Sequence, residues 1–148
     1  MRVINLYGPC HQRENFWQHL LNLSIFSLDH IILGGDLNFS MGYGESWGSQ
    51  AQVDSIIRFM INLLDQHNFV DIPMNKPLST WRNRRVGDAA LARRLYYFLI
   101  KVPVMNQMHH FKQWVGSRGI LNHSPIYLEV FGPHPKPKAP FKFNHVWL

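Results

Sequence analysis

The chain has little of what marks a membrane-embedded or disulfide-stabilised protein. Its 148 residues include one cysteine, and no apolar run approaches the roughly 20 residues that a membrane-spanning helix requires. Cys10 therefore has no partner for an internal disulfide, and residues 1–7 lack the long apolar stretch of a signal peptide. We expect one small globular unit in an intracellular setting, with nucleus and cytoplasm both open and no membrane as a partner.

Acidic residues are scarce, above all in the second half of the chain. Nine Asp and Glu stand against fifteen Lys and Arg, so the formal net charge is +6. Residues 1–74 carry a net charge of −4, whereas residues 75–148 carry +10. A basic half suits a polyanion such as nucleic acid, because cations on phosphates release bound counterions. Ordinary solubility accounts for the same composition equally well.

The hydrophobic pattern predicts helices layered on sheets. Amphipathic helices are expected over residues 14–23 and 53–64, where apolar side chains recur at helical spacing. The expected strands share apolar or aromatic content bounded by Gly, Pro, Asn or Arg, and they cover residues 3–7, 30–35, 79–82, 94–100 and 125–131. This order predicts an α/β or α+β sandwich.

Two segments are distinguished by composition. Residues 1–131 read as the folded part, while residues 132–140 are rich in proline and predict an extended linker. Residues 141–148 turn apolar again. We therefore divide the chain into 1–131 and a second part, 132–148, made of a Pro-rich linker and an apolar C-terminal segment.

The strongest local signal for chemistry is the segment 34–38, Gly-Gly-Asp-Leu-Asn, directly after an expected buried strand. In an extended chain, side chains two residues apart share a face, so Asp36 and Asn38 should project together while Leu37 points away. A carboxylate can deprotonate water, and an amide can hold a phosphoryl oxygen. An Asx turn after a strand explains the same residues without any catalysis.

Two further side chains stand at the ends of expected strands. Tyr7 could donate a hydrogen bond to a phosphate, or it could be a half-buried aromatic before a turn. His123 could give or take a proton near neutral pH, or it could be structural. The other histidines and Cys10 lack the spacing of a zinc site or of an activated nucleophile.

Five segments together resemble, in the same order, the motifs of the endonuclease/exonuclease/phosphatase superfamily. They are Asn5-Leu6-Tyr7-Gly8-Pro9, Gly34-Gly35-Asp36-Leu37-Asn38, Ser79-Thr80-Trp81, Arg94-Leu95-Tyr96-Tyr97-Phe98-Leu99 and Asn122-His123-Ser124-Pro125-Ile126. Residues 71–73 and 140–147 resemble the endonuclease region of plant long interspersed element (non-LTR) retrotransposons, which a reverse transcriptase follows. The resemblance implies a four-layered α/β sandwich that hydrolyses phosphodiesters with Mg²⁺.

The resemblance also implies site residues. Asp36 matches the water-activating aspartate, Asn38 the phosphate-orienting asparagine, Tyr7 the phosphate-contacting tyrosine and His123 the catalytic histidine. The partner implied is DNA or another nucleic acid.

Three departures from the family pattern concern acidic positions. The family's opening strands, with a metal-binding glutamate, are expected before Met1, so the sandwich should be partial. Asn122 and Tyr96 stand where the resemblance places aspartates. Because Mg²⁺ prefers anionic oxygen ligands, we expect weak binding, with Asn122 offering at most one carbonyl oxygen. We also expect His123 to lack the partner that would orient its ring.

A group of arginines brackets a loop of small residues, and these side chains are expected to contact a nucleic-acid backbone. The group comprises Arg82, Arg84, Arg85, Arg93 and Arg94. The alternative is a solvated hairpin whose arginines contact nothing.

These expectations combine into one hypothesis for function. The chain should be a degenerate relative of a magnesium-dependent phosphodiesterase, a retroelement DNA endonuclease, with little or no activity. The alternatives are a non-catalytic nucleic-acid-binding remnant and a phosphatase or RNA-degrading branch of the same superfamily.

Overall fold

A computed structural model describes residues 1–108 and 110–131 of the chain. The linker and the apolar segment expected over 132–148 lie outside these residues. The helices and strands, in chain order, are β1 (Arg2–Tyr7), α1 (Arg13–Asn22), η1 (Ile25–Ser27), β2 (Ile31–Asp36), η2 (Tyr43–Glu45), β3 (Ser46–Trp47), α2 (Ile57–Gln66), β4 (Phe69–Asp71), β5 (Trp81–Arg82), η3 (Gly87–Ala89), β6 (Ala92–Arg93), β7 (Tyr96–Lys101), α3 (Val102–Gln107), β8 (His110–Val115) and β9 (Ile126–Phe131). None of the helices described is long and apolar enough to cross a membrane.

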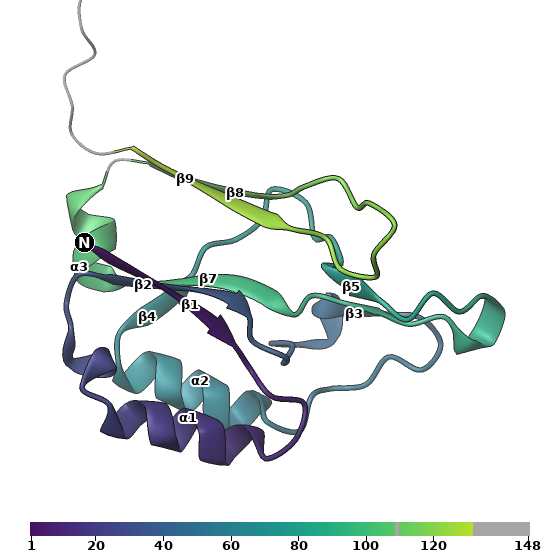
Figure 1. Cartoon of the computed structure of the whole chain (residues 1–148), viewed down its shortest axis with the longest axis horizontal. Helices are drawn as coiled ribbons and strands as arrows, with labels where there is room; N and C mark the ends of the chain where they lie inside the picture. Colours follow the sequence, from purple (N-terminus) through teal and green to yellow (C-terminus); the bar gives the residue numbers. More distant parts are fainter. Residues whose placement is uncertain (109, 132–148) are drawn as a thin grey trace, which may run out of the picture.

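A four-stranded sheet in the order β1-β2-β7-β4 forms the centre of the molecule. Strands β1 and β2 are parallel, whereas β7 runs antiparallel to both β2 and β4. In Figure 1, α1 and α2 lie side by side along one face of this sheet, and the β8–β9 ribbon lies on the other side. The α/β sandwich expected from the sequence is therefore confirmed.

Strand β2 is buried on both faces, which explains why its sequence is a continuous apolar run and not an alternating one. Ile31 and Leu33 belong to the larger core cluster, which includes residues of α1 and α2. Ile32 belongs to a second cluster with Ile100 of β7 and Val104 of α3. Helices α1 and α2 thus cover one face of β2, and α3 with the β8–β9 ribbon covers the other.

Helix α2 begins at Ile57, four residues later than the pattern predicts. The reason is Asp54, whose Oδ1 accepts a hydrogen bond from the Ile56 N–H at 3.3 Å. Its Oδ2 accepts from the Ser40 N–H at 3.3 Å, and its Oδ1 lies 2.7 Å from Nη2 of Arg13 in α1. Asp54 therefore holds the chain in a turn before the helix and ties that turn to α1.

Several elements are not expected from the sequence: the short strands β3, β4 and β6, helix α3 and strand β8. Helix α3 has only six residues and carries Pro103 in its first turn, so helical periodicity has no room to appear. Strand β8 pairs with β9 from His110↔Phe131 to Val115↔Ile126 and is polar at several positions.

A small sheet in the order β3-β6-β5 adjoins one end of the main sheet. It is the end at which the pairing of β2 with β7 finishes, at Asp36 and Tyr96. The small sheet is linked to the loop before β9 by an isolated bridge between Trp81 and His123. The Ser124 N–H strengthens this link by donating to the Thr80 carbonyl at 2.7 Å. The loop that carries His123 is thereby held beside the small sheet.

Candidate active site

The register of the main sheet places one carboxylate between two phenols. Asp36, the last residue of β2, pairs with Tyr7 of β1 on one side and with Tyr96 of β7 on the other. Directly paired residues of neighbouring strands project from the same face of a sheet. The Asp36 side chain is 4% exposed, whereas Tyr7 is largely exposed. The three side chains therefore form a row with a buried carboxylate at its centre, a half-buried phenol on one side and an exposed phenol on the other.

Asn38 turns back onto Asp36. Its φ angle of 52° is in the left-handed region, and its backbone N–H donates to Asp36 Oδ1 at 3.2 Å. Its side-chain amide donates to the carbonyl of Gly8, and Leu37 between them is buried in the core. Asp36 and Asn38 thus converge as the sequence predicts. The contact that brings them together is an Asx turn, which was the alternative interpretation of this segment. The two residues therefore form a turn and also lie close enough to act on one group.

His123 has an orienting partner, and the expectation that it lacks one is wrong. Its Nδ1 lies 3.0 Å from the Tyr96 hydroxyl and 3.6 Å from Asp36 Oδ2. Burial raises the pKa of Tyr96 above its ordinary value, and the negative charge of Asp36 raises it further. The phenol is therefore neutral at pH 7, and its O–H can donate a hydrogen bond to an unprotonated Nδ1 of the imidazole.

The environment of Asp36 makes its carboxylate more basic than usual. Burial raises the pKa of Asp36, and this exceeds the opposing effects of the Asn38 N–H and of the His123 ring. A more basic carboxylate is a better proton acceptor at neutral pH. Asp36 can therefore accept a proton at the end of β2, beside the His123 ring.

These residues line an open pocket of about 340 Å³, which we call the Asp36 pocket. Its lining residues are Tyr7, Cys10, Arg13, Asp36, Asn38, Trp81, Arg93, Leu95 and His123. The structure therefore brings Tyr7, Asp36, Asn38 and His123 together. The sequence alone did not place Arg13 or Trp81 here, although Trp81 is the last residue of the motif segment 79–81 and Arg13 lies four residues after the segment 5–9.

The five predicted arginines occupy three different environments. Arg93 lines the Asp36 pocket. Arg94 points the other way: its guanidinium is 7% exposed and contacts Asp71 and Glu45 at 2.7 Å each. Because these carboxylates already bind it in the interior, the expectation that Arg94 contacts nucleic acid is wrong.

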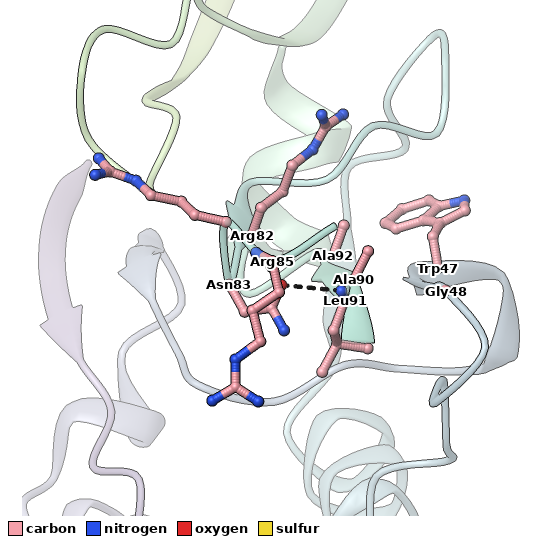
Figure 2. A pocket seen from close by; sticks show the side chains of 9 residues that line it. Trp47, Gly48, Arg82, Asn83, Arg85, Ala90, Leu91 and Ala92 are labelled. Carbon is pink, nitrogen blue, oxygen red and sulfur yellow. Dashed lines mark hydrogen bonds between the residues drawn. The ribbon is translucent and has the colours of Figure 1, made fainter. Parts of the chain in front are cut away.

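The other three arginines are exposed and line a second pocket of about 400 Å³, which we call the arginine pocket. Its lining residues are Trp47, Gly48, Arg82, Asn83, Arg84, Arg85, Ala90, Leu91 and Ala92. Figure 2 shows the indole of Trp47 at one end of this group and arginine side chains at the other. The dashed line in the figure joins Asn83 Oδ1 to the Leu91 N–H at 3.0 Å. This hydrogen bond connects the two sides of the loop between β5 and β6.

The residues described do not fit a Mg²⁺ ion. Among them there is no group of three or more His, Cys, Asp and Glu side chains that could hold a metal. Asp36 is the one carboxylate lining the Asp36 pocket, and Asn122, expected as a weak ligand, is absent from that lining. The Asn122 backbone carbonyl instead accepts a hydrogen bond from the Arg82 N–H at 3.0 Å. A hard cation that prefers several anionic oxygens has too few here.

No protein-family model and no curated protein sequence matches the chain. Solved structures do match. The endonuclease domain of TRAS1, a telomere-specific non-LTR retrotransposon, is similar with a TM-score of 0.64 and 12% identity over 85% of this chain and 54% of that domain. A 3′–5′ exonuclease (NExo) from Neisseria meningitidis is similar with a TM-score of 0.61 and 14% identity over 88% of this chain and 61% of the exonuclease.

The chain therefore has the α/β fold of these two nucleases, in agreement with the fold that the resemblance of its motifs implies. It spans between half and two thirds of the length of the two nucleases it matches.

Proposed function

We propose that the chain is a degenerate relative of a retroelement DNA endonuclease, which binds nucleic acid and retains little or no phosphodiester-cleaving activity. The observation that carries this proposal is the composition of the Asp36 pocket. Tyr7, Asn38 and His123 gather around Asp36, as a phosphodiesterase requires, yet Asp36 is the one carboxylate in the lining.

The missing charge explains why cleavage should be weak. Hydrolysis of a phosphodiester needs stabilisation of the charge that develops on the phosphoryl oxygens. Magnesium would supply it when bound, and a lone buried carboxylate next to guanidinium groups should bind this ion weakly. Loss of a single preorganised contact of this kind typically costs on the order of 10²–10³ in rate.

Nucleic-acid binding without cleavage is a second candidate, favoured by the arginine pocket. Arg82, Arg84 and Arg85 are exposed, and Trp47 beside them offers a flat aromatic surface. Guanidinium groups contact phosphates irrespective of sequence, and an indole can stack on an unpaired base. These contacts need neither Asp36 nor a metal.

A plasmid-nicking assay separates the two candidates. We expect little nicking by the wild type with Mg²⁺ or with a chelator. A variant with Asn122→Asp and Tyr96→Asp adds carboxylates beside His123. It should nick faster than the wild type in Mg²⁺ and should show no such gain in the chelator. The same variant carrying His123→Ala is the control and should lose the gain.

Two outcomes would contradict the proposal. Rapid Mg²⁺-dependent nicking by the wild type, abolished by Asp36→Ala, would show a working enzyme. Plasmid retention that is unchanged by Asp36→Ala, with no nicking by the restored variant, would favour the binding module.

A further inference from the structure

We propose that the Asp36 pocket binds a phosphate group without a divalent cation, with Arg93 as the principal anion-binding residue. The proposal rests on the proposed function only for the source of the phosphate, which we take to be the backbone of a nucleic acid. Three features of the pocket support it: the unused hydrogen-bonding capacity of Arg93, the alignment of Arg93 with His123, and the excess of donors over free acceptors.

Arg93 is the arginine whose charge is least satisfied around this site. Arg13 pairs with Asp54, and Arg94 pairs with Asp71. Among the described residues, Arg93 has no carboxylate within ion-pair distance, and its buried Nε has no hydrogen-bond acceptor. A buried guanidinium donor without an acceptor is unfavourable, so an incoming anion would satisfy it.

The strand register aligns Arg93 with His123 through one intermediate residue. Arg93 of β6 pairs with Trp81 of β5, and Trp81 forms the isolated bridge with His123. Residues paired across neighbouring strands project from the same face, and all three line the Asp36 pocket. The guanidinium, the indole and the imidazole therefore form a continuous row along one wall.

Donors exceed free acceptors in this pocket. The Tyr7 hydroxyl, the Trp81 indole N–H and the Arg93 guanidinium can all donate. Asp36 opposes an anion, but its Oδ1 accepts from the Asn38 N–H and its Oδ2 faces His123. Such a lining suits tetrahedral phosphate oxygens, which only accept hydrogen bonds, better than it suits a cation.

The test observes the His123 ring directly. The imidazole signals of the full chain are followed by nuclear magnetic resonance during titration with inorganic phosphate in a chelator. We expect the His123 signals to shift in the wild type, with half-saturation weakened at least tenfold in Arg93→Gln. Arg93→Lys should fall between the two, because it keeps the charge and loses the forked donor geometry. Arg58→Gln, which removes an exposed arginine of α2, is the matched control and should behave as the wild type.

A second arm identifies the source of the phosphate. A fluorescent oligonucleotide is titrated in chelator against the same four proteins and competed with inorganic phosphate or with a mononucleotide. Weakened oligonucleotide binding in Arg93→Gln but not in Arg58→Gln supports a backbone phosphate. If phosphate shifts His123 while oligonucleotides do not bind, the phosphate site stands and the proposed function fails.

Several results would overturn the phosphate site. These are an unshifted His123 in the wild type, a shift that needs added Mg²⁺, or equal half-saturation in wild type and Arg93→Gln. Circular dichroism spectra establish that the variants are folded. If Arg93→Gln is unfolded, Arg93→Lys decides, and phosphate binding equal to that of the wild type would count against a forked contact.

Discussion

The hydroxyl of Tyr96 lies 3.0 Å from Nδ1 of His123, at a position where the family resemblance places an aspartate. A phenol at this position changes the chemistry of the pair without leaving the ring unsupported. A carboxylate would favour the charged imidazolium, whereas a neutral phenol donates to the neutral imidazole. The arrangement therefore keeps the ring oriented and removes part of the electrostatic support for its charged form.

Tyr96→Phe should remove this hydrogen bond and leave the ring packing in place. We expect a loss of about 1 kcal/mol in the free energy of unfolding, the typical net value of a neutral hydrogen bond. Urea denaturation measures it, and the ring-nitrogen shifts of His123 should change at the same time. Tyr43→Phe alters an exposed phenol and is the control. Equal stability of both variants, with unchanged His123 shifts, would show that the contact has no energetic role.

Arg94→Gln should destabilise the fold strongly, although the sequence alone suggests a surface arginine. Removing it leaves Asp71 and Glu45 without their shared cation in a largely buried network. Breaking a buried ion pair from one side costs about 3–5 kcal/mol. The control Arg85→Gln changes an exposed arginine and should stay within about 0.5 kcal/mol of the wild type. Urea unfolding of the two variants side by side decides whether this network supports the core.

Much of the fold can be predicted from the sequence because its signals are local. The apolar run of β2 and the helical spacing in α1 are set by neighbouring residues, and the structure confirms both elements. The segment 34–38 also predicts that Asp36 and Asn38 lie close together, because they are two residues apart. The prediction assumed an extended chain, whereas the structure brings them together through a turn at Asn38.

What the sequence does not predict depends on contacts between distant segments. Nothing near Arg94 indicates that Asp71 and Glu45 will reach it, 23 and 49 residues away. Arg93 and His123 are likewise brought into one row only by strand pairing through Trp81. Adjacent arginines can therefore have unrelated roles, and only the tertiary register assigns them.

Asp36 should make the stability of the protein depend on pH. Burial raises the pKa of Asp36 in the folded state above the unfolded value near 3.8. Its contribution is therefore fully present below that value and is lost as the pH rises through the folded pKa. Relative to Asp36→Asn, the wild type should lose stability as the pH rises from about 4 through the raised pKa of Asp36. Urea unfolding across this range measures the difference, with Asp88→Asn as the exposed control. A wild type that gains stability over the same interval would show that the carboxylate is stabilised in the folded state.

Arg84→Gly should separate stability from nucleic-acid binding. Arg84 has a φ angle of 59°, in the left-handed region that disfavours residues with a side chain by roughly 1–2 kcal/mol. Glycine removes this strain, and the gain is reduced by the lost hydrogen bond to the Ile120 carbonyl and by the larger backbone entropy of the unfolded chain.

We therefore expect Arg84→Gly to unfold at an unchanged or slightly higher urea concentration while binding duplex DNA more weakly. If Arg84 contacts one phosphate, the slope of log affinity against log salt should decrease by about 0.9. Arg82→Gly is the matched control for stability alone, because Arg82 lies in strand β5, where glycine costs roughly 0.5–1 kcal/mol. An Arg84→Gly protein with unaltered affinity and salt slope would place this arginine outside the binding surface and leave its strained backbone without a functional explanation.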